Sequence, residues 1–132
     1  MTLLKPPGDD GIIPRNQMPQ VDPADIPVLL SYLGSLDVSF SAGLIDPAKV
    51  AAHQLVDEQK AMAIPDSVMA FPVLLSKEPA IIDGDHRWYA HLMEKRDMPF
   101  IRFDKPFLVI VRMIFTFPKT YKETGYDDKK VG

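Results

Sequence analysis

The sequence has 132 residues, a formal net charge of −3 at pH 7 and no cysteine. With 46% hydrophobic residues it has enough apolar side chains to bury the core of one small domain, and it does not have the composition of a disordered chain. The absence of thiols excludes disulfides, iron–sulfur clusters, thiolate zinc sites and cysteine nucleophiles. The net charge argues against binding nucleic acid by bulk charge, although it leaves room for a local basic patch.

The first twenty residues predict an extended arm, because residues 5–20 are rich in proline, glycine and aspartate. They lack the apolar central segment of a signal peptide. We expect the folded domain over residues 21–118 and a polar tail over residues 119–132.

The first half of the domain predicts two helices and one strand. The first helix begins near Pro23, with Asp22 as its cap, and Gly34 helps to end it. Residues 38–42 alternate as a strand does, and residues 45–50 predict a turn into one helical turn. Residues 54–64 predict the second helix, which ends before a proline.

The second half predicts a hairpin, a helix and a strand. Residues 73–75 and 80–82 are apolar and flank a polar turn, and residues 85–95 have helical periodicity. Residues 98–103 predict a strand. The apolar run 107–117 is ambiguous, since its β-branched residues favour a strand and its length favours a helix; it is too short to span a bilayer, so we expect no membrane partner. The fold class is therefore α/β (α+β), a small mixed sheet with flanking helices.

The most informative segment is the predicted strand-to-helix junction at residues 83–87, Asp-Gly-Asp-His-Arg. The N–H groups at a helix N-terminus favour anions, and Arg87 adds a guanidinium that fits phosphate oxygens. Asp83, Asp85 and His86 add groups that hold a metal ion or move a proton. This combination is what a phosphate or nucleotide site needs.

Each junction residue also has a structural interpretation. Gly84 lets a phosphate approach the backbone, or is a simple turn residue. Arg87 binds phosphate, or pairs with Asp83 on the surface. Asp85 is a metal ligand or base, or is the helix N-cap, which is the interpretation we favour. Asp83 is harder to explain as a cap and is the best candidate for a metal-binding or catalytic carboxylate, while His86 transfers a proton or has no role.

The aromatic and histidine residues around the junction carry weaker signals. Trp88 and Tyr89 either stack on a base or belong to the core, with Trp88 the better core candidate. His53 and His91 do not have the spacing of metal ligands, so we expect no zinc site.

Several motifs occur together in an informative order: Asp-Gly-x-His-Arg at 83–87 between a strand and a helix, then Met-Pro-Phe-Ile-Arg-Phe at 98–103. Upstream lie Met-Pro-Gln at 18–20, Gln54 and Lys60. Together they resemble the ParB/sulfiredoxin-like superfamily, most closely the small ParB-like proteins of bacteriophages, some of which are described as nucleases. The resemblance covers residues 18–103.

In that superfamily the helix after the motif points its N-terminus at nucleotide phosphates, which the motif arginine contacts. The resemblance thus implies a nucleotide or nucleic acid as partner, Mg²⁺ and a nucleoside triphosphate as cofactors, and a phage protein in the host cytoplasm. The implied phosphate-binding residues are Gly84, Asp85, His86, Arg87, Gln54 and Lys60. The implied catalytic residues are Asp83, Asp85 and His86, with Asp83 as metal ligand.

The superfamily includes a CTP-dependent DNA-partition switch, an ATP-dependent sulfinic-acid reductase, a kinase of free serine and nucleases, so the fold does not determine the function. The reductase chemistry needs a cysteine that is absent here, and the sequence after Phe117 has no counterpart of the helix-turn-helix domain of partition proteins. Glu58 is the one candidate for the kinase's catalytic glutamate.

Two hypotheses remain. The protein is an Mg²⁺-dependent nuclease, NTP hydrolase or small-molecule kinase, or it is a non-catalytic DNA-binding or regulatory module that keeps the pocket for recognition. The base, the substrate and the formation of a homo-oligomer stay open.

Overall fold

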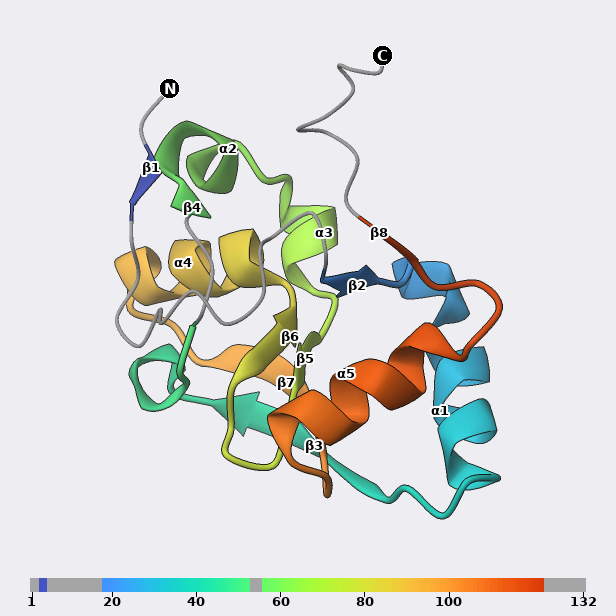
Figure 1. Cartoon of the computed structure of the whole chain (residues 1–132). Coiled ribbons are helices and arrows are strands. Elements are labelled where there is room, and N and C mark those ends of the chain that lie inside the picture. The colour runs from blue at the N-terminus through green and yellow to red at the C-terminus, as the bar shows by residue number, and fades with distance from the viewer. Residues whose placement is uncertain (1–2, 5–17, 53–55, 123–132) are drawn as a thin grey trace.

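The computed structural model of the chain describes residues 3–4, 18–52 and 56–122 (Figure 1). Its centre is a four-stranded sheet in the order β3-β7-β5-β6. The strands are β3 (Phe40–Ile45), β7 (Met98–Phe103), β5 (Val73–Leu75) and β6 (Ile81–Asp83). β5 runs parallel to β7, and the other neighbours are antiparallel. The mixed sheet with flanking helices confirms the predicted α+β class.

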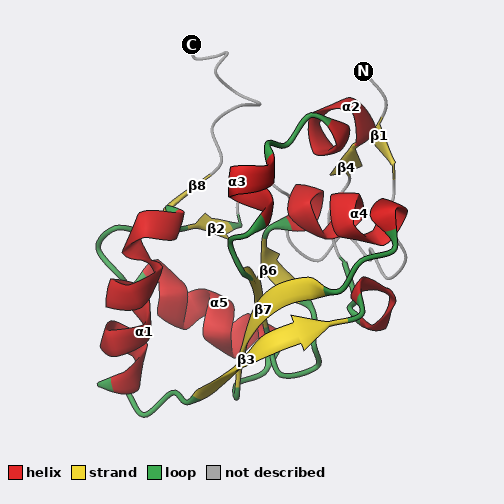
Figure 2. Cartoon of the chain, turned by 180° about the vertical axis from the view of Figure 1, so that it is seen from behind, coloured by secondary structure: helices red, strands yellow, loops and turns green. Residues whose placement is uncertain are grey.

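The alternation of side chains along the strands divides the core into two layers. On one face of the sheet, α1 (Ile26–Gly34) and α5 (Phe107–Phe115) cover a cluster that includes Leu74, Ile82 and Phe103. On the other face, α4 (Asp85–Glu94) covers a cluster that includes Val73, Leu75 and Ile81. Figure 2 shows the same sheet from behind, with β3 at its outer edge.

The structure confirms the predictions for residues 73–103: a hairpin, a helix and then a strand, β7. Leu75 pairs with Ile81 across β5 and β6, α4 begins at Asp85, and β7 covers the predicted strand residues. The strand predicted at 38–42 is also present, but it is displaced and longer, because all six residues of β3 pair with β7.

The ambiguous segment 107–117 is the helix α5. Its buried residues are Phe107, Ile110, Val111 and Ile114, a spacing that fits one face of a helix. The Glu78 carboxylate accepts a hydrogen bond from the Phe107 N–H at 3.1 Å, which satisfies a donor that the helix itself leaves without a partner. Tertiary packing thus overrides the β-branched composition.

The first helix begins as predicted, but in two parts. A 3₁₀ turn, η2 (Pro23–Asp25), precedes α1, which buries Ile26, Leu29 and Leu33. Asp22 occupies the cap position without forming a side-chain capping bond. Further along, the 3₁₀ turn η3 (Pro47–Lys49) confirms the helical turn predicted there.

The helix predicted over 54–64 is wrong in its first part. Residues 53–55 lie outside the described residues, and β4 (Val56–Asp57) pairs with β1 (Leu3–Leu4). The helix α2 (Glu58–Met62) begins only after Asp57, because the Asp57 carboxylate accepts from the Lys60 N–H and caps it there. A short helix, α3 (Asp66–Met69), follows and was not predicted.

The predicted limits of the domain need two corrections. Met18, assigned to the arm, is only 1% exposed and belongs to the core. The next residues form β2 (Pro19–Gln20), which pairs with β8 (Tyr121–Lys122) in the segment assigned to the tail. Residues 18–20 and 121–122 thus belong to the folded part, through pairing between residues about a hundred positions apart that local composition does not indicate. The rest of the predicted arm (residues 5–17) and of the predicted tail (residues 123–132) lies outside the described residues. No helix within the described ranges is long and apolar enough to cross a membrane.

Candidate phosphate-binding site

Gly84 lies at the turn between β6 and α4 and has a conformation that few other residues adopt. Its φ is +114°, in the left-handed region. A Cβ placed there would lie 2.9 Å from Nη2 of Arg87 and 3.0 Å from Cγ2 of Val73. Both the backbone and the close packing therefore require glycine at this position.

The N-terminus of α4 has no side-chain cap. Gly84 itself holds the cap position, and its carbonyl accepts from the Trp88 N–H at 2.8 Å. Asp85 is the first residue of the helix and is 5% exposed. The prediction that Asp85 is the N-cap is therefore wrong: the left-handed Gly84 takes the cap position, so the helix begins one residue earlier than a cap at Asp85 would give.

Arg87 is held by the protein itself. Its Nη1 donates to the carbonyls of Phe71 at 3.3 Å and Pro72 at 3.2 Å, and Nη2 lies 4.0 Å from Oδ1 of Asp83. Both charged side chains are only 12% exposed. Burial lowers the pKa of Arg87, while the charges of Asp83 and Asp85 oppose that shift. The guanidinium thus ties α4 to the segment that enters β5.

Asp83 connects the junction of β6 and α4 to the segment that precedes η2. Its Oδ2 accepts a hydrogen bond from the Val21 N–H at 3.3 Å, and its other oxygen faces Arg87. The carboxylate is therefore engaged on both sides by the fold. The predicted alternative, a pairing of Arg87 with Asp83, is present, but it is largely buried and not on the surface; it accounts for the position of Asp83 without any ligand.

His86 and Tyr89 connect α4 to β4 and α2. The Nε2 atom of His86 accepts from the Asp57 N–H at 3.0 Å. The Tyr89 hydroxyl donates to Oε2 of Glu58 at 3.2 Å. Desolvation and the Glu58 charge raise the pKa of Tyr89. His86 and Glu58 thus both accept hydrogen bonds from other parts of the fold.

The aromatic pair belongs to the core. Trp88 is 2% exposed and its indole N–H donates to the Pro47 carbonyl at 2.8 Å; Tyr89 is 9% exposed. Trp88 is confirmed as the core residue, and Tyr89 is buried as well, so neither ring is open to a stacked base. Lys60 lies on α2 with an exposed side chain, whereas Gln54 lies outside the described residues.

The junction does not fit a resident Mg²⁺ ion. Within the described ranges no group of three or more His, Asp or Glu side chains is arranged to hold a metal. Asp83 already accepts from the Val21 N–H, and the guanidinium 4.0 Å from its other oxygen repels a cation. A magnesium ion would therefore have to arrive bound to the phosphates of a nucleotide, as Mg²⁺ commonly does in proteins.

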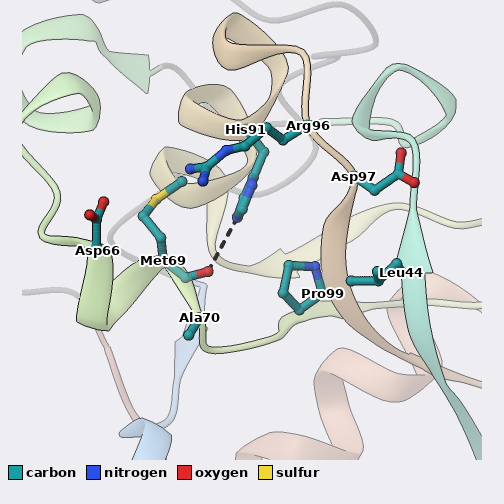
Figure 3. Close-up of a pocket in the computed structure, with 8 residues that line it drawn as sticks. All are labelled: Leu44, Asp66, Met69, Ala70, His91, Arg96, Asp97 and Pro99. Atoms are coloured by element: carbon teal, nitrogen blue, oxygen red, sulfur yellow. Dashed lines mark hydrogen bonds between the residues drawn. The ribbon is translucent and has the colours of Figure 1, made fainter.

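A second polar group that the sequence did not single out lines a pocket of about 240 Å³ (Figure 3). His91 of α4 is 4% exposed, its Nε2 lies 3.2 Å from the Met69 carbonyl, and its buried Nδ1 has no hydrogen-bond partner. Burial lowers the pKa of His91. The lining residues come from β3, α3, α4, β7 and the loops that follow α3 and α4, so no local pattern could have indicated the pocket.

Comparisons with known proteins found no match: no family model, no curated protein and no solved structure matches the chain. The resemblance to ParB-like proteins therefore rests on the motifs alone.

Proposed function

We propose that the protein binds the phosphate of a nucleotide or nucleic acid at the junction of β6 and α4. One observation carries this proposal: Nη2 of Arg87 lies 2.9 Å from the position where a Cβ of Gly84 would be. A guanidinium and the electropositive N-terminus of a ten-residue helix therefore lie beside the same glycine, and both attract a phosphate.

The contacts of Arg87 indicate how binding would proceed. The two carbonyl contacts orient the guanidinium through Nη1, and Nη2 faces Asp83 at 4.0 Å, which is a weak ion pair. A phosphate oxygen that approaches Nη2 competes with the Asp83 carboxylate. Asp83 therefore sets the affinity by repelling the ligand that Arg87 attracts.

Recognition is supported better than turnover. The groups that would move protons are engaged within the fold: His86 accepts from Asp57, and Asp83 accepts from Val21. One observation favours turnover. The Asp83 carboxylate lies beside Arg87 and would repel a bound phosphate, which is unfavourable if the site only recognises its ligand. Asp83 would then take a proton from a nucleophile at the bound phosphate.

The test is a binding titration of nucleoside triphosphates, inorganic phosphate and short DNA, with and without Mg²⁺, by calorimetry and thermal shift. A ligand at about 100 times its dissociation constant adds about 2.7 kcal/mol to the free energy of unfolding. Arg87→Lys should weaken binding about tenfold or more because the planar fork is lost. The matched control is Arg96→Ala, since Arg96 is half exposed and lies two residues beyond the C-terminal end of α4.

Asp83→Asn separates the two functions. If the protein only recognises its ligand, the variant should bind phosphate more tightly, because the competing negative charge is gone. For turnover, it still binds but loses Mg²⁺-dependent product formation. If none of these ligands binds the parent protein, or if Arg87→Lys binds as the parent does, the junction is not a phosphate site.

A further inference from the structure

The strand β3 is an edge of the sheet in the described part of the chain, and it lacks the features that usually protect an edge. All six of its residues pair with β7 without irregularity. Five of the six are exposed, and its sequence, Phe-Ser-Ala-Gly-Leu-Ile, has neither charge nor proline. Edge strands are normally blunted by lysine, proline or bulges, so a regular, uncharged edge is a template for another strand. Figure 2 shows no element in front of β3.

The hydrogen bonds at the start of β3 define which of its backbone groups face outwards. The Asp104 N–H donates to the Ser39 carbonyl at 3.1 Å, and the Ser39 N–H donates to Oδ1 of Asp104 at 3.2 Å. Ser39 therefore faces β7. Backbone groups alternate along an antiparallel strand, so the N–H and C=O groups of Phe40, Ala42 and Leu44 face the open edge.

The side chains of the same three residues are arranged symmetrically. Phe40 is 47% exposed and Leu44 is 68% exposed. They lie on one face of the strand, each two residues from Ala42. An antiparallel copy of the strand centred on Ala42 would thus place each phenylalanine opposite a leucine.

We propose that β3 pairs with β3 of a second copy of this chain, antiparallel and about a two-fold axis at Ala42. Phe40 then lies opposite Leu44 of the partner subunit, and every outward backbone group of the three residues finds a partner. A shift of one residue would put Phe40 opposite Ile45 of the partner subunit, on the wrong face. No charged residue lies within the paired strands, so no like charges oppose one another.

The size of the contact indicates a dimer that dissociates on dilution. One pair of six-residue strands buries less than the roughly 1,600 Å² of a standard interface, so we expect a dissociation constant in the micromolar range. The phosphate junction follows β6, the opposite edge of the sheet. Dimerisation leaves it accessible, and the two proposals can fail independently.

The first test is sedimentation of the full chain over a wide range of concentration. The parent protein should pass from monomer to dimer. Leu44→Lys should raise the dissociation constant by at least about tenfold, because symmetry places the lysine at two positions of the interface. Met93→Lys is the control: Met93 is 51% exposed on α4, and its replacement should leave dimerisation unchanged. A parent that stays monomeric, or a Leu44→Lys variant that dimerises equally well, would overturn the proposal.

The second test checks the register. Because the chain has no cysteine, Ala42→Cys introduces a single thiol about 5.5 Å in Cα separation from its symmetry mate. A short bis-maleimide should link the two subunits. Ala48→Cys, also exposed, lies six residues from the axis and should give little linked dimer. Equal linking of the two variants, or none at Ala42→Cys in a dimeric sample, contradicts the register.

Discussion

At the scale of the residue, Arg87 has a structural role whatever ligand it meets. Arg87→Ala removes the donor to two carbonyls and leaves Asp83 buried without its cation. We expect the free energy of unfolding to fall by about 2–4 kcal/mol, measured by urea denaturation. Arg87→Lys should recover only part, because one ammonium cannot reproduce the fork.

The control for that experiment is Arg96→Ala. Arg96 pairs with Glu94 at 2.5 Å, and both side chains are about half exposed. Such surface pairs contribute little, so we expect a change within about 0.5 kcal/mol. If both variants lose the same stability, the buried contacts of Arg87 are not what stabilises the junction.

His91 gives a prediction on pH. Burial is the main reason that its folded-state pKa is lowered; Arg96 and Arg87 act in the same direction, and Glu94 and the Met69 carbonyl oppose it. Below about pH 6.5 the unfolded chain therefore binds the proton more readily than the folded one, and stability falls as the pH falls. Urea denaturation between pH 7.5 and 5 should show this loss. His91→Gln, which keeps a donor for Met69, should show a smaller loss over the same range.

At the scale of the element, the start of α4 depends on Gly84. Gly84→Ala places a Cβ where φ is +114° and where Val73 and Arg87 approach to about 3 Å. We expect a loss of about 1–3 kcal/mol in unfolding free energy. Gly34→Ala is the matched control: a Cβ there meets nothing within 4 Å, and alanine is the better helix former, so stability should stay equal or rise. Equal effects of the two substitutions, measured by thermal denaturation, would count against the strained turn.

At the scale of the whole molecule, one sheet separates two core layers and both depend on it. Ile110 of α5 belongs to the core layer on one face of the sheet, and Ile81 of β6 belongs to the layer on the other face, which α4 covers. Both side chains are fully buried. Each substitution to alanine should cost about 2–5 kcal/mol. Because the layers share the sheet, each variant should unfold in one transition by both fluorescence and circular dichroism. Two separate transitions would show that the layers are independent units.

Local patterns predicted a large part of this fold. The hairpin, α4 and β7 follow from apolar spacing and turn residues within about thirty consecutive positions, and α1 from its own apolar face. These patterns involve residues that are close in sequence, so they can be recognised without knowledge of tertiary contacts. The interpretation of Gly84 as a turn residue between a strand and a helix also came from the local sequence, and its φ of +114° is a conformation that glycine adopts readily.

Only the tertiary structure decided what the junction residues contact. The partners of Arg87 and Asp83 include the carbonyls of Phe71 and Pro72 and the N–H of Val21, main-chain groups that every sequence carries. No pattern of side chains marks which carbonyl meets which guanidinium. The same holds for β2 with β8 and for the open edge of β3, because strand order depends on contacts between distant segments. The sequence by itself therefore determined the local elements and the chemical groups at the junction, and long-range packing determined which of those groups the fold itself uses.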